Sequence, residues 1–131
     1  MEHQQLSANI GITDYIHWLS QFGASADGGV TRLLYTKEWM DAQLAVKKKM
    51  TSSGLETRFD DVGNVFGRLS GTESPGELIL TGAHIDTVIN GGKYDGAYGV
   101  LAIIRLRKTY GRPKKHWKLF RFVRRKGAVF P

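Results

Sequence analysis

Apolar residues recur every three or four positions in three stretches of the chain, the spacing of a helix that buries one face. Thr36 can cap the start of the second stretch, and Gly23 and Gly54 can end the first and the second. Small residues at the start of the third stretch would let it lie close against a sheet. The sequence therefore predicts helices over residues 14–22, 36–54 and 96–110, and it predicts that Met40, Leu44, Val46 and Met50 line the apolar face of the second.

Between the second and third helices the pattern changes to that of strands. Residues 55–59 and 65–69 alternate in polarity around an Asp-Asp-Val-Gly-Asn turn, which predicts a hairpin. Residues 77–82 contain a continuous apolar run, the pattern of a strand that is buried on both faces. We expect the hairpin to form an edge pair beside this central strand. The fold class is therefore α/β, with a central sheet flanked by helices.

Metal-competent side chains follow the third predicted strand. His84 and Asp86 are two residues apart, so an extended chain directs both to one side, and Asp95 comes just before the third helix. An imidazole nitrogen and a carboxylate oxygen together suit zinc, manganese or cobalt. Asp86 can be a ligand, or the acceptor that fixes the histidine tautomer. Taken alone, the spacing also fits an ordinary strand-end histidine and a helix-capping aspartate, since such short patterns arise by accident.

Length and composition narrow the class of protein. The chain has 131 residues and 41% hydrophobic residues, which fits one globular domain. It has no cysteine, so disulfides and thiolate metal sites are excluded. The first residues lack the basic-then-apolar build of a signal peptide, and no apolar run is long enough to span a bilayer. We expect a cytoplasmic protein with no membrane partner.

The net charge of +7 is distributed unevenly. All twelve acidic residues lie before residue 105, whereas residues 105–131 contain eleven Lys and Arg and no acid. The chain is thus a mildly acidic domain followed by a strongly basic tail. A basic tail with interleaved aromatic residues can bind nucleic acid, and this is the alternative class of function. Arg32, outside the tail, is interpreted as a charge on a surface loop in preference to a substrate contact.

The segment after the apolar strand, TGAHIDTVINGGKYDGAYG, carries a more specific signal. It resembles the first metal-binding segment of the zinc-dependent aminoacylase and carboxypeptidase superfamily, most closely the branch of allantoate amidohydrolases and N-carbamoyl-L-amino-acid hydrolases. The resemblance covers residues 12–104, and Ala83 stands where serine is common. It implies that this chain is a truncated, N-terminal part of a metallopeptidase-like catalytic domain.

The resemblance also implies a role for each residue of the motif. His84 would bind one metal ion, Asp86 would be the catalytic aspartate that orients it, and Asp95 would bridge two ions, Mn²⁺ or Zn²⁺. The implied reaction is hydrolysis of a ureido or carbamoyl C–N bond by metal-activated water, with a small-molecule substrate. Allantoate, in purine catabolism, is the expected substrate, and an N-carbamoyl-L-amino acid is the alternative. Relatives are homodimers, and their dimerising domain has no counterpart here.

The family's general base and one further metal ligand are glutamates in an E-E-E-G-S-R-F-P segment. Here the corresponding segment reads RRKGAVFP, with Arg125 and Lys126 in register with the two glutamates. A cation replaces neither a base nor a ligand of a metal cation. No other segment of this chain resembles the missing motif.

Back-translation offers an explanation for the tail. If one adenine is restored to the lysine codons of Lys114 and Lys115, codons that encode HWKLFRFVRRKGAVF also encode TLEVVSFCEEEGSRF. The recovered string is an apolar strand that ends in the family's glutamate motif. We therefore divide the chain into residues 1–115, part of the catalytic domain, and residues 116–131, a basic tail read out of frame. The chain as encoded is expected to be inactive and to bind no nucleic acid specifically.

Overall fold

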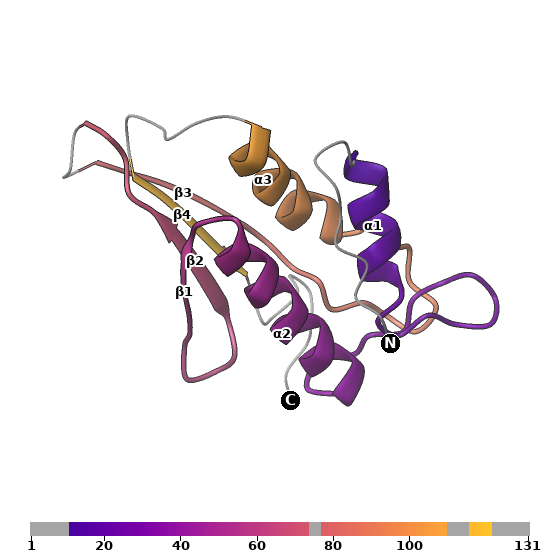
Figure 1. The fold of residues 1–131 in the computed structure, drawn as a ribbon. Helices are drawn as coiled ribbons and strands as arrows, with labels where there is room; N and C mark the ends of the chain where they lie inside the picture. The colour runs from indigo at the N-terminus through magenta and orange to yellow at the C-terminus, as the bar shows by residue number, and fades with distance from the viewer. Residues whose placement is uncertain (1–10, 74–76, 110–115, 122–131) are drawn as a thin grey trace.

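The computed structural model describes residues 11–73, 77–109 and 116–121, which form one four-stranded sheet with three helices to one side of it (Figure 1). The elements in chain order are α1 (Ile12–Ser20), α2 (Lys37–Ser52), β1 (Glu56–Phe59), β2 (Val65–Leu69), β3 (Leu78–Ala83), α3 (Ala97–Thr109) and β4 (His116–Arg121). All three predicted helices and all three predicted strands are confirmed, with ends that differ by at most two residues.

The signals that delimit α2 act as the sequence predicts. The Thr36 hydroxyl accepts a hydrogen bond from the backbone N–H of Trp39 at 3.3 Å, and Gly54 turns the chain out of the helix at a φ of 88°. The buried face, however, differs from the prediction. Met40 and Leu44 are 45% and 51% exposed, because the stripe that meets the sheet consists of Trp39, Ala42, Gln43, Val46 and Met50. Met40 and Leu44 lie one position beyond that stripe.

The predicted hairpin forms one edge of the sheet. β1 and β2 are antiparallel, with Phe59 opposite Val65. The Asp60 carboxylate closes the turn by accepting hydrogen bonds from the backbone N–H of Val62 at 3.1 Å and of Asn64 at 2.8 Å. Three alternate residues of β2 are buried toward the helices, so this strand has one core face.

The apolar strand β3 is not the buried central strand that the sequence predicts. The sheet order is β1-β2-β4-β3, so β3 is an edge strand, and Leu78, Ile79 and Leu80 are 51%, 47% and 54% exposed. β4 pairs parallel with β3 and antiparallel with β2, and therefore separates β3 from the hairpin. An apolar run predicts burial only where other elements cover both faces, and α3 covers one. Exposed apolar side chains on an edge strand favour association with other chains.

The core joins all three helices to the sheet. Tyr15 of α1, Met50 of α2, Val65 of β2 and Ile104 of α3 belong to one cluster of buried apolar side chains. Ile85, in the loop that follows β3, is fully buried in the same cluster. The loop that carries the candidate chemistry is thus attached directly to the core. Within the described ranges, each helix is too short or too polar to cross a membrane.

Candidate functional site

The structure brings His84, Asp86 and Asp95 together at the end of β3. His84 Nδ1 lies 3.1 Å from the backbone carbonyl oxygen of Asp86 and 3.5 Å from its Oδ1, and His84 Nε2 lies 4.0 Å from Asp95 Oδ1. The two aspartates therefore face opposite nitrogens of one imidazole. Asp86 is buried, whereas half of the Asp95 side chain is exposed.

This arrangement favours one tautomer of His84. A carbonyl oxygen can only accept a hydrogen bond, so the contact with Asp86 requires the proton on Nδ1. The lone pair of Nε2 is then directed to the side on which Asp95 lies. Asp86 thus lies where it can orient the ring, and His84 Nε2 and Asp95 Oδ1 face each other.

The distances and donor types suit a divalent cation. Two ligands of one tetrahedral zinc ion lie about 3.4 Å apart when each bond is about 2.1 Å, and Nε2 and Oδ1 are 4.0 Å apart. Asp86 Oδ1 is buried and has no hydrogen-bond partner within the described residues. No group of three His, Asp or Glu side chains gathers around a potential metal position in the described part of the chain. His84 and Asp95 are two candidate ligands within the described residues, and Arg125 and Lys126 lie outside those ranges.

Gly96 packs directly against the histidine. It has a φ of 70°, and a Cβ atom built on it would lie 2.3 Å from the His84 carbonyl oxygen and 2.6 Å from Nδ1. Glycine is therefore required at this position for two reasons: the backbone has a positive φ, and a side chain would overlap His84. The close approach holds Asp95 beside the imidazole ring.

The environment of His84 predicts an altered titration. The Asp86 side chain raises the pKa of His84, partial burial opposes the shift, and the carboxylate of Asp95 adds to the increase. A raised pKa means that the fold favours the protonated ring. His84 therefore stabilises the fold below the unfolded pKa of about 6.5, and this contribution is lost as pH rises through the higher folded value.

We expect an NMR titration of the metal-free chain to give a His84 midpoint above about 6.5. The Asp86→Asn variant should lower that midpoint, since the amide carries no charge. An Asp86→Asn midpoint equal to that of the unmodified chain would show that the carboxylate does not act on His84.

Arg32 corrects the sequence interpretation, because it is not a surface charge. Its side chain is 1% exposed, and its guanidinium donates hydrogen bonds to the carbonyl oxygens of Ile85 and Leu19, both at 2.7 Å, and of Phe22 at 2.9 Å. Burial lowers the pKa of Arg32 to about 10, and the charge of Asp86 opposes that shift. Arg32 is therefore a buried cation at neutral pH. No sequence pattern signalled this, since its hydrogen-bond acceptors are backbone atoms.

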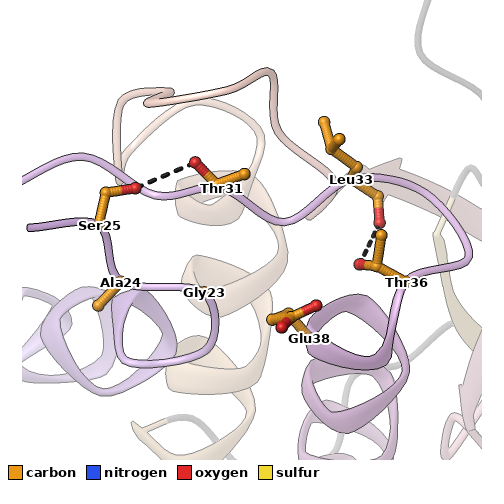
Figure 2. A pocket seen from close by; sticks show the side chains of 7 residues that line it. All are labelled: Gly23, Ala24, Ser25, Thr31, Leu33, Thr36 and Glu38. Atoms are coloured by element: carbon orange, nitrogen blue, oxygen red, sulfur yellow. Dashed lines mark hydrogen bonds between the residues drawn. The ribbon is translucent and has the colours of Figure 1, made fainter.

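A separate hollow lies away from this site. An open pocket of about 280 Å³ is bordered by residues that include Ser25, Thr31, Thr36 and Glu38, and none of the three predicted site residues lines it (Figure 2). The hydroxyls of Ser25 and Thr31 lie 3.0 Å apart across its edge (Figure 2). The candidate site at His84, at the end of β3, is therefore separate from this pocket.

Comparison with known proteins finds amidohydrolases related to this chain, although no family model matches it. The chain is 70% identical to an allantoate amidohydrolase of Bacillus subtilis over its whole length, which is 33% of that relative. It is 41% identical to an N-carbamoyl-L-amino-acid amidohydrolase of a Pseudomonas species over 70% of the chain and 22% of the relative. The chain therefore spans about a third or less of the curated relatives it matches.

Solved structures agree with the sequence matches. A hydantoinase/carbamoylase family amidase from Burkholderia ambifaria superposes with a TM-score of 0.77 at 28% identity. The superposition covers 84% of this chain and 28% of the amidase chain. The α/β fold predicted from the sequence is thus the fold of part of this amidase.

Proposed function

We propose that this chain carries half of a metal-dependent amidohydrolase site. The chain belongs to the family of allantoate and N-carbamoyl-L-amino-acid amidohydrolases and spans about a third of their length. The reaction of the complete site is the hydrolysis of a ureido or carbamoyl C–N bond. Allantoate is the proposed substrate because the chain is 70% identical to an allantoate amidohydrolase over its whole length, and an N-carbamoyl-L-amino acid is the alternative.

One observation carries the proposal: a single imidazole lies between the backbone carbonyl of Asp86, which faces Nδ1, and the carboxylate of Asp95, which faces Nε2 and can share an ion with it. His84 would bind the ion through Nε2, and Asp95 would bind it through a carboxylate oxygen. When bound, a divalent cation supplies Lewis-acid activation of the carbonyl group and of water.

The chain's own residues prepare that chemistry. Asp86 keeps the proton on Nδ1 of His84, so that Nε2 remains a ligand. Gly96 leaves room for the ring beside Asp95. Because metal binding requires the neutral imidazole, and the pKa of His84 is raised, protons compete with the ion as pH falls through that value.

The other half of the site, in this proposal, is encoded in a different reading frame. Residues 1–115 are the catalytic-domain part, and residues 116–131 are the product of a one-base loss within the codons of Lys114 and Lys115. The two glutamates that would complete the site correspond to Arg125 and Lys126. The support for this is the recovered E-E-E-G-S-R-F string, which accounts for the basic tail without invoking a nucleic acid.

The experiment that tests the function starts from the gene. Sequencing across the codons for residues 113–115 should reveal, once one adenine is restored, a frame that continues beyond residue 131. The product of that restored frame should release ammonia from allantoate or from an N-carbamoyl-L-amino acid, and it should not release acetate from an N-acetyl amino acid, which lacks the ureido group.

Metal removal gives a further expected result with the same product. Chelation should reduce hydrolysis to background, because the ion supplies the activation of carbonyl and water, and added Mn²⁺ or Zn²⁺ should restore it. The Asp95→Ala variant should not recover on metal addition, whereas an Asp41→Ala variant, at a half-exposed position of α2, should. Hydrolysis that survives complete chelation would contradict the proposal.

A further inference from the structure

The loop that carries His84 and Asp86 is held by a short segment far from it in the sequence, residues 30–32. The backbone N–H of Thr87 donates to the carbonyl oxygen of Arg32 at 2.9 Å, and the backbone N–H of Arg32 donates to the Thr87 hydroxyl at 2.8 Å. Val30 and Gly91 exchange two backbone hydrogen bonds of 2.9 and 2.8 Å. The metal loop is therefore paired with residues 30–32 as if with a neighbouring strand.

The side chain of Arg32 adds a second attachment on the other side of Asp86. Its Nε donates to the carbonyl oxygen of Ile85 at 2.7 Å, so Arg32 holds both neighbours of Asp86, Ile85 by its side chain and Thr87 by its backbone. Asp86 is the residue whose carbonyl oxygen meets His84 Nδ1. Arg32 thus fixes the Asp86–Thr87 peptide group, whose carbonyl selects the histidine tautomer, and the Ile85–Asp86 peptide group before it.

The other end of the guanidinium explains why the cation can be buried there. Nη1 donates to the carbonyl oxygens of Leu19 and Phe22, at and just beyond the C-terminal end of α1. The last carbonyls of a helix have no partner within the helix and carry a partial negative charge, so they suit a cation. The charge of Asp86 also favours the charged form of Arg32. Arg32 therefore connects the end of α1 to the metal loop.

We propose that Arg32 is a positioning residue of the metal site: by holding Ile85 and Thr87 on either side of Asp86, it keeps the Asp86 carbonyl against His84 Nδ1 and directs His84 Nε2 toward Asp95. Arg32 does not contact the ion or the substrate. This inference rests on the proposed function, in which His84 and Asp95 share a divalent cation.

The test compares the 131-residue chain with Arg32→Lys and Arg32→Met by histidine ¹⁵N NMR, first without metal and then during titration with zinc. The unmodified chain should show His84 protonated at Nδ1, and zinc should shift the His84 signals. The donors of a lysine ammonium all radiate from one nitrogen, so they cannot replace both Nε on Ile85 and Nη1 on Leu19 and Phe22. Both variants should therefore show a mixture of tautomers and bind zinc about 10- to 100-fold more weakly.

Gln43→Met is the matched control. Gln43 is fully buried, and its Nε2 donates to the carbonyl oxygen of Gly63 at 2.6 Å, in a loop that does not carry the site. This variant should lose stability and leave the His84 tautomer and the zinc affinity within about twofold of the unmodified chain. Folded Arg32 variants that likewise keep the His84 tautomer and the zinc affinity would overturn the inference, because Arg32 would then be only a structural residue.

A second measurement needs no variant. If Arg32 couples the loop to the ion, zinc must in turn strengthen the attachment, so hydrogen exchange at the Thr87 and Gly91 amides of the unmodified chain should slow at least threefold on zinc binding. Unchanged exchange at saturating zinc would overturn the inference. If zinc leaves His84 unaffected, the proposed metal site is wrong, and the tautomer comparison in metal-free protein still decides the role of Arg32.

Discussion

The 131-residue chain should hydrolyse allantoate at least about 1,000-fold more slowly than the product of the restored reading frame, when both are assayed with Mn²⁺. General acid–base catalysis alone contributes about 100- to 10,000-fold, and the proposed base corresponds to a cationic residue in this chain. Arg125 and Lys126 would also repel a second metal ion where a glutamate should bind it. Ammonia release per mole of protein is the measurement.

Two variants of the restored product make the comparison interpretable. His84→Ala should fall to the level of the 131-residue chain, because the first metal ligand is then missing. His17→Ala, on the exposed side of α1, should retain full activity. Turnover by the 131-residue chain within tenfold of the restored product would contradict the assignment of the missing glutamates to the other frame.

Among substitutions that add one methyl group near the site, Gly96→Ala should lower the free energy of unfolding most. The left-handed conformation at φ 70° costs a non-glycine residue about 1–2 kcal/mol, and the overlap with the His84 carbonyl adds about 1–3 kcal/mol of strain. We expect the free energy of unfolding in urea to fall by about 2–5 kcal/mol. Relief of the overlap must move His84 away from Asp95, so zinc should no longer shift the His84 NMR signals.

Two other glycines separate the causes of that loss. Gly28 has a φ of 83° and no atom within 4 Å of an added Cβ, so Gly28→Ala should show the conformational cost alone. Gly92 lies in the same loop as the site and also has open space around it, so Gly92→Ala should be close to neutral. If Gly96→Ala is no more destabilising than Gly28→Ala, His84 is not held by this contact.

The sequence predicted those features whose signals are local. Thr36, Gly54 and the turn at Asp60 delimit their elements through atoms a few residues away, so composition and spacing were sufficient. His84 and Asp86 were predicted together because a period of two is a property of the extended backbone. The approach of Asp95 came from the family resemblance, and the structure supplied the distance.

Features that depend on distant parts of the chain were missed. Arg32 reads as an ordinary charged loop residue, and its burial depends on carbonyl groups of α1 and of the loop after β3, one of which lies 53 residues away. The exposure of Leu78, Ile79 and Leu80 depends on where β4 enters the sheet, which an apolar run does not encode. Burial is a property of the assembled layers, whereas the pattern of a segment describes only that segment.

The central claim is that His84 and Asp95 together bind one divalent cation, and Mn²⁺ tests it most directly. At substoichiometric concentration, this paramagnetic ion should broaden the amide NMR signals of residues 83–86 and 95–97 before any others. Either His84→Ala or Asp95→Ala should abolish the effect. The claim is contradicted if broadening centres instead on another acidic segment, such as Asp60 and Asp61, and persists unchanged in both variants.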